Sequence, residues 1–125
     1  MFRKKDKSVH DKMVEAVVSS LSSELYTAVK ANILGYNTPS KIIRPETEDG
    51  FIPDVTGRVE DFLYIYEVET EDTISTENSK NKCLLFSDYA TKHNAIFVIV
   101  VPTGCKDKAL KQTNEWCVTV HIQEI

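Results

Sequence analysis

Hydrophobic residues recur at helical spacing in the first third of the chain. The repeating positions are Val14, Val17, Val18, Leu21, Leu25, Ala28, Val29 and Ile33. On a helix these positions would form one apolar stripe, with Ser8 as a suitable N-cap and Gly35 as a suitable stop. The pattern therefore predicts one long amphipathic helix over residues 8–34, followed by a surface loop over residues 35–50.

Two segments typical of β-strands come next, over residues 51–59 and 62–69. Glu60 and Asp61, which separate them, suit a tight turn. The two segments are therefore predicted to pair as an antiparallel hairpin.

The second half of the chain alternates between helical and strand-like patterns. A helix is predicted over residues 76–93, and the apolar run over residues 95–102 is typical of a buried parallel strand. A short helix over residues 106–113 and a last strand over residues 116–122 complete the order αββαβαβ. This order predicts an α/β fold with a central mixed sheet, which combines a hairpin with parallel strands and has helices on both faces.

Size and composition limit the class of protein. A chain of 125 residues with 42% hydrophobic residues suits one domain over residues 1–125, and its net charge of −4 argues weakly against a strongly basic nucleic-acid binder. Cys83, Cys105 and Cys117 form no close pair, which favours reduced thiols and a cytoplasmic location. The longest apolar run is too short to span a bilayer, so no membrane partner is expected.

Three carboxylates are predicted to meet on the hairpin. With Glu60 and Asp61 as the turn, Asp54 falls opposite Glu67, and Glu69 lies on the same face one step further along its strand. Carboxylates this close raise one another's pKa unless a cation lies between them, and Mg²⁺ or Mn²⁺ suits oxygen ligands. A solvated strand end that happens to carry two glutamates is the simpler alternative.

The segment that contains these carboxylates resembles a known nuclease motif. Pro53-Asp54, a hairpin and then Glu67-Val68-Glu69 are similar to the motif of the PD-(D/E)XK nucleases, the restriction-endonuclease-like superfamily. The resemblance extends from the first helix to the last strand. It implies a restriction-endonuclease-like fold, DNA as substrate and a requirement for Mg²⁺ or Mn²⁺.

The resemblance also assigns roles to individual residues. It implies that Asp54, Glu67 and the backbone carbonyl of Val68 bind the metal. Glu69 occupies the position where most members of the superfamily have a lysine, although some active members also have a glutamate there. Activity is therefore a hypothesis, with Glu69 as a catalytic candidate.

Lys82 could replace the missing lysine from the predicted helix over residues 76–93. It falls on the same side of that helix as Ser79 and Phe86, the side expected to face the sheet. The alternative is that Lys82 extends from the helix edge into solvent.

Other residues are weaker candidates. The resemblance allows Glu24, on the predicted first helix, to support the metal as a secondary site, although a solvated glutamate on an amphipathic helix is the simpler interpretation. His10, His93 and His121 fall on different elements without metal-ligand spacing and receive no role.

The sequence thus predicts a metal-dependent DNA endonuclease that hydrolyses phosphodiester bonds, with Asp54, Glu67, Glu69 and Lys82 as catalytic residues. A second hypothesis is an inactive module of the same fold for nucleic-acid binding or assembly. A third is a structural or regulatory domain whose acidic face holds a cation or a basic partner. Because so short a chain has little surface for gripping a duplex, a homodimer or a partner protein is plausible.

Overall fold

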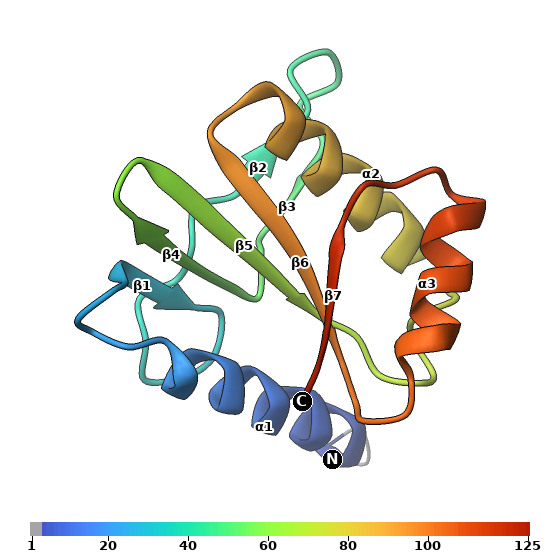
Figure 1. Cartoon of the computed structure of the whole chain (residues 1–125), viewed down its shortest axis with the longest axis horizontal. Coiled ribbons are helices and arrows are strands. Elements are labelled where there is room, and N and C mark those ends of the chain that lie inside the picture. Colours follow the sequence, from blue (N-terminus) through green and yellow to red (C-terminus); the bar gives the residue numbers. More distant parts are fainter. Residues whose placement is uncertain (1–3) are drawn as a thin grey trace.

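The chain forms a mixed β-sheet with helices packed against both faces (Figure 1). The computed structural model describes residues 4–125, with side chains described from residue 9 onward. Its elements are α1 (Lys4–Ser20), β1 (Thr27–Ala31), β2 (Ile42–Ile43), β3 (Gly50–Phe51), β4 (Val55–Val59), β5 (Phe62–Val68), α2 (Glu77–Lys92), β6 (Ala95–Val101), α3 (Lys106–Glu115) and β7 (His121–Glu124).

The main sheet has five strands in the order β1-β4-β5-β6-β7. β1, β4 and β5 pair antiparallel, whereas β5, β6 and β7 pair parallel. The apolar strand β6 therefore lies inside the sheet as a parallel strand, which confirms that prediction and the mixed α/β class. β2 and β3 form a separate two-stranded ribbon.

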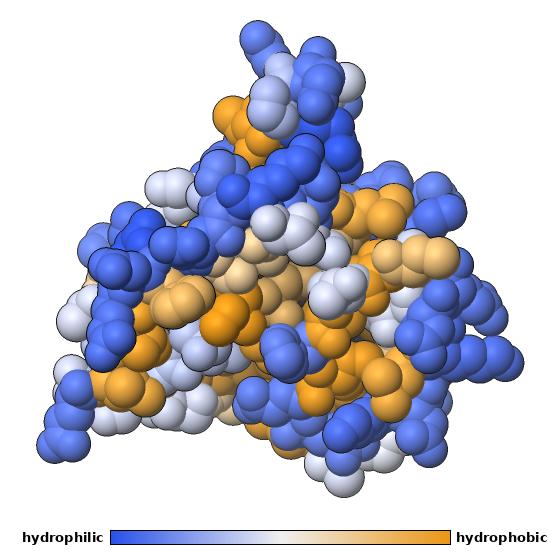
Figure 2. Space-filling view, turned by 45° about the horizontal axis from the view of Figure 1, so that its top comes forward, coloured by the Kyte–Doolittle hydropathy of each residue, from blue (hydrophilic) through white to orange (hydrophobic). Residues whose placement is uncertain are grey.

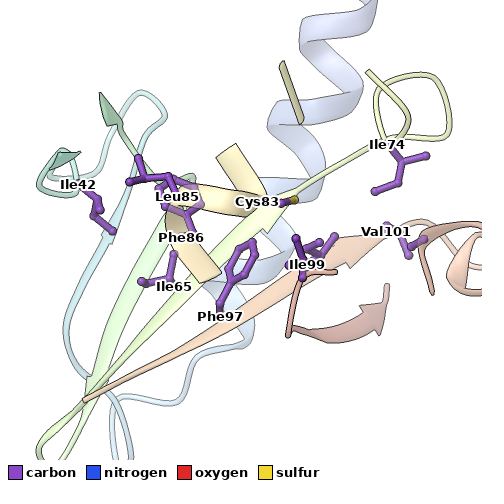
Figure 3. Packing of buried hydrophobic residues seen from close by; sticks show 11 residues of the cluster. Ile42, Ile65, Ile74, Cys83, Leu85, Phe86, Phe97, Ile99 and Val101 are labelled. Atoms are coloured by element: carbon purple, nitrogen blue, oxygen red, sulfur yellow. The ribbon is translucent and has the colours of Figure 1, made fainter. Parts of the chain in front are cut away.

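Alternation along the strands creates two hydrophobic cores. On β5, Tyr66 and Val68 face one side and pack with Val14 and Val17 of α1. Ile65 faces the other side, where the core of α2, α3 and the neighbouring strands includes Phe86, Phe97, Ile99 and Val101 (Figure 3). Helices therefore cover both faces of the sheet, as predicted.

Helix α2 follows its sequence signals closely. Thr76 is the N-cap, and its side chain accepts a hydrogen bond from the Ser79 backbone N–H. Cys83 and Phe86 continue the buried stripe that begins at Ser79, and His93 is the C-cap. The predicted helix over residues 76–93 is confirmed.

The predicted first helix is only half correct. Helix α1 ends at Ser20, and residues 27–31 form the edge strand β1 instead. Ser20 and Ser22 end the helix with local hydrogen bonds, from Ser20 Oγ to the Val17 carbonyl and from the Glu24 N–H to Ser22 Oγ.

The proposed ends of that helix also need correction. Ser8 lies inside α1 rather than capping it, and Gly35 lies beyond β1. Leu25, predicted to belong to the apolar stripe, is 57% exposed in the turn between α1 and β1.

The predicted strand over residues 51–59 is divided in two. Pro53 has no backbone N–H and interrupts the ladder, so that β4 begins at Val55. Gly50 and Phe51 pair instead with β2, inside the segment predicted to be a loop. Gly50 permits this pairing because a Cβ atom there would overlap the carbonyl oxygen of Ile42.

The last strand begins later than predicted. The Trp116 N–H still bonds to the Gln112 carbonyl, which makes Trp116 the C-cap of α3 rather than the start of a strand. Cys117 then turns the chain with a φ of 58°, and β7 begins at His121. Val118 and Val120 alternate as in a strand, but they lie in the segment that connects α3 to β7.

Much of the surface is polar, but large apolar side chains are also exposed. Figure 2 shows one face on which hydrophobic side chains lie between borders of hydrophilic ones. None of the helices within residues 4–125 is both long and apolar enough to span a bilayer.

Phe86→Ala should destabilise the fold by about 3–5 kcal/mol, because Phe86 is fully buried and stacks edge-on against Phe97. Phe62→Ala is the matched control, since Phe62 is 46% exposed at the hairpin turn and should cost less than about 1 kcal/mol. Urea unfolding measures both. Equal costs would contradict this description of the core.

Candidate functional site

The candidate site lies where β4 begins and β5 ends. The ladder runs from Val59 opposite Phe62 to Val55 opposite Tyr66, around the turn at Glu60 and Asp61. One further step places Asp54 opposite Glu67, and the Asp54 N–H donates to Glu67 Oε1 at 3.3 Å. The predicted register, and with it the pairing of these two acidic residues, is confirmed.

Asp54 is fixed by its own carboxylate and by the backbone. Its Oδ2 atom accepts a hydrogen bond from the Val68 N–H at 2.8 Å, and its carbonyl accepts one from the Asn32 N–H at 2.8 Å. Regular pairing of β4 with β5 ends at Val55 and Tyr66. Beyond that point, the Asp54 side chain takes the place of a backbone acceptor for the Val68 N–H. Asp54 is only 6% exposed, so these bonds hold its carboxylate in one position.

The Val68 carbonyl points to the side of β5 on which Asp54 lies. The Glu69 N–H donates to the Val100 carbonyl of β6, whereas the Val68 N–H faces Asp54. The N–H and C=O of one strand residue point to the same side, so the Val68 oxygen also faces the start of β4. Pro53 has no N–H to offer this oxygen.

Buried Glu67 forms an ion pair with Lys82, whose side chain is 27% exposed. Glu67 is 1% exposed, and its Oε2 atom lies 3.3 Å from Lys82 Nζ. Lys82 comes from α2 and crosses the face of the sheet, with Nζ 6.0 Å from the ring centre of Phe51. The structure thus brings Lys82 into contact with Glu67 rather than leaving it in solvent.

The negative charge of the site exceeds what Lys82 compensates. Burial, followed by the charge of Asp54, raises the pKa of Glu67 well above its ordinary value, although Lys82 acts in the opposite direction. Burial would lower the pKa of Lys82, but the charges of Glu67, Asp54 and Glu69 outweigh it and raise that pKa. Bound protons or a further cation would therefore stabilise this cluster.

Glu69 lies beside the pair but is held differently. It is 4% exposed, and Oε1 accepts a hydrogen bond from Thr73 Oγ1 at 2.6 Å. Burial raises the pKa of Glu69, and the bond to Thr73 partly offsets this. Ser79 is also buried nearby, and its Oγ atom has no hydrogen bond of good geometry.

The expected convergence of three carboxylates on one ion needs correction. Within the described residues, no group of three or more His, Cys, Asp or Glu side chains is arranged to hold a metal. Asp54 and Glu67 remain together, whereas Glu69 is turned toward Thr73 in the segment after β5. The hairpin register fixes which face a side chain occupies, but not its hydrogen-bond partner.

His10 is the site residue that sequence reasoning missed. Its Nε2 atom lies 3.3 Å from Asp54 Oδ2, and this contact raises the pKa of His10 despite partial burial. His10 precedes Val14 by four residues and Val17 by seven, so the helical pattern places it on the face of α1 that packs against the sheet. That spacing was the available signal.

Glu24 does not join the site. It is exposed in the turn after α1, not on the helix where it was expected. His10, which does reach Asp54, lies more than two helical turns before the end of α1, so Glu24 is separated from the site by about 15 Å of helix.

The oxygen donors present suit one hard divalent cation. Mg²⁺ is commonly held by one or two carboxylates, with water and substrate oxygens completing its coordination. Asp54, Glu67 and the Val68 carbonyl supply such donors at one strand end, and the raised pKa of Glu67 indicates charge that a cation would stabilise. Lys82 and His10 currently contact these carboxylates.

No family model, curated protein or solved structure matches this chain. Its class therefore follows from its own geometry: an α/β protein with a five-stranded mixed sheet flanked by helices. Within that class, the chain is characterised by buried Asp54 and Glu67 at the end of β5, with the half-buried Lys82 paired to Glu67.

Glu67→Gln should raise the free energy of unfolding at pH 7, because burial disfavours the charged form of Glu67 and glutamine carries no charge. The folded state binds the Glu67 proton more tightly than the unfolded state does, because its pKa is raised from 4.5. This contribution favours folding at low pH and is lost as pH rises above 4.5 toward the raised value. The variant should therefore lose less stability than wild type between pH 4 and pH 7.

Chemical denaturation across this pH range measures the effect, with Glu46→Gln on the exposed 44–49 turn as the matched control. The control should leave the pH dependence unchanged. A less stable Glu67→Gln protein at pH 7 would contradict the account, since it would show that attraction to Lys82 outweighs burial.

Proposed function

We propose that this protein is a metal-dependent phosphodiester hydrolase that acts on DNA, with a restriction-endonuclease-like site. The observation that carries the proposal is the buried pair of Asp54 and Glu67 at the end of β5, with Lys82 Nζ 3.3 Å from Glu67. Buried charge is costly to folding, and such clusters concentrate at functional sites.

The proposed ligands are the carboxylates of Asp54 and Glu67 and the carbonyl of Val68. A bound Mg²⁺ or Mn²⁺ would supply a Lewis acid for the phosphodiester and an activated water. Asp54 is preorganised for this role because the Val68 and Asn32 backbone N–H groups hold it. Glu67 is preorganised by burial and by the Asp54 N–H.

Lys82 takes the role of the motif lysine that is absent at position 69. Its ammonium group approaches from α2 and remains charged, because neighbouring carboxylates raise its pKa. Next to a phosphodiester it would stabilise the developing negative charge or orient the attacking water. Glu69 is a weaker catalytic candidate because Thr73 already holds its carboxylate.

One observation favours a second function, a nucleic-acid-binding or assembly module without hydrolysis. Lys82 contacts Glu67 and His10 contacts Asp54, so both carboxylates already have a basic partner. A cluster compensated in this way can persist without metal. Either function is compatible with a cytoplasmic protein that works as a homodimer or with a partner protein.

The hydrolase function predicts cleavage of DNA in Mg²⁺ or Mn²⁺ and none in EDTA. Glu67→Gln and Asp54→Asn should each reduce the rate at least about 100-fold, because each removes a charged ligand. Lys82→Met should reduce the rate on the order of 10²-fold, with a smaller effect on substrate binding. The assay uses single-stranded, duplex and branched DNA across a metal series.

Lys80→Met is the matched control for Lys82→Met, since Lys80 lies on the same helix but interacts with none of the carboxylates of the site. It should cleave at the wild-type rate. Glu69→Lys distinguishes the roles at position 69. Higher activity would indicate a degenerate motif, whereas loss of activity would indicate that Glu69 takes part in the reaction. If wild type cleaves no substrate in any metal, the binding-module function replaces the hydrolase.

A further inference from the structure

A groove lies on the α2 side of the sheet, between β1, β4, β5 and the segment that leads into β2. Its volume is about 310 Å³, and three cationic side chains line it, those of Lys30, Lys41 and Arg58. No acidic residue is among the described residues that line this groove. We call it the basic groove.

The cations of the basic groove lack ionic partners within the described part of the chain. No carboxylate there lies within 4.0 Å of the charged atoms of Lys30, Lys41 or Arg58. The chain as a whole has a net charge of −4, so three unpaired cations around one hollow depart from the average surface. Their arrangement complements a ligand with several negative charges.

The basic groove is aligned with the candidate site. Lys30 pairs with Thr56 across β1 and β4, and both Thr56 and Leu63 line the groove on the sheet face that also carries Glu67. Arg58 follows Asp54 by four residues on the same face, a separation of about 13 Å along the strand. The basic groove therefore lies on the same face of the sheet as the candidate site.

The remaining lining residues suit an unpaired nucleotide. Tyr89 lines the groove, and its ring stacks on His93 with ring centres 4.1 Å apart, which restrains its orientation. Aromatic rings next to cations bind single strands by base stacking and phosphate contacts. The volume lies at the lower end of the range for small-ligand pockets, about 300 Å³, which suits a nucleotide unit rather than a duplex.

We propose that the basic groove binds single-stranded DNA, with phosphates on Lys30, Lys41 and Arg58 and a base against Tyr89. This inference rests on the proposed function for its class of ligand, because a polynucleotide is the substrate proposed for the Asp54–Glu67 site. The groove would hold the strand beside the hydrolytic residues.

The test is fluorescence anisotropy with labelled ten-nucleotide single-stranded DNA, measured with the full chain in EDTA across a salt series. Combined Lys30→Ala, Lys41→Ala and Arg58→Ala should weaken binding at least tenfold. They should also reduce the slope of log affinity against log salt by roughly 2, because each phosphate contact on a single strand contributes about 0.7. The same strand in duplex form should bind more weakly to wild type.

The matched control removes three lysines of α3, Lys106, Lys108 and Lys111, which causes the same change in net charge. α3 packs near β7, at the opposite end of the strand order from β1 (Figure 1). The control should retain most of the affinity. Equal losses in the two triple variants, or tighter binding of duplex than of single strand, would overturn the proposal.

Tyr89 separates base stacking from charge. Tyr89→Phe should bind like wild type, whereas Tyr89→Leu should bind several-fold more weakly, with thermal melting used to verify that both are folded. Equal affinities for the two variants would overturn the assigned base contact. Binding in EDTA does not require hydrolysis, so groove-dependent binding without cleavage in Mg²⁺ would contradict the hydrolase proposal and leave this inference intact.

Discussion

The register of the β4–β5 hairpin decides where the charged groups of the site lie. A two-residue turn at Glu60 and Asp61 sets this register, and a slip by one residue would reverse every side chain on one strand. In the observed register Asp54 lies opposite Glu67 near the end of β5. Glu67 faces α2, where it contacts Lys82. The hydrophobic alternation that separates the two cores fixes the same register, so core packing and site geometry depend on one constraint.

The site places charge where folding alone would favour apolar groups. Glu67 is as buried as the core residues around it, and Lys82 compensates its charge only in part. Asp54 is better accommodated, because the Val68 N–H and His10 approach it from the backbone and from α1. Basic side chains from helices on opposite faces, His10 and Lys82, thus contact the two carboxylates. This arrangement costs stability, because burying a charge is unfavourable unless its partners compensate it fully.

The sequence predicted the elements whose local signals agreed with their surroundings. The predictions of the turn, α2 and β6 were correct, because capping, spacing and apolar runs each indicated the same structure. The helix predicted over residues 21–34 was wrong. Leu21, Leu25 and Ala28 have helical spacing, but pairing with β4 makes residues 27–31 a strand. The pairing of Asp54 and Glu67 followed from register, but the bond from Thr73 to Glu69 and the contact of His10 depend on tertiary packing. The direction of Lys82 could be predicted from helix geometry, whereas its contact with Glu67 could not.

The central claim is that Asp54 and Glu67 together bind a divalent cation. Crystals grown with Mn²⁺, measured near the manganese absorption edge, test it directly, because anomalous density identifies the ion and its position. The account predicts one peak at about 2 Å from carboxylate oxygens of both residues, with Lys82 Nζ displaced from Glu67, and no such peak in Asp54→Asn. Crystals of wild type without this peak, in which Lys82 still contacts Glu67 at saturating Mn²⁺, would contradict it.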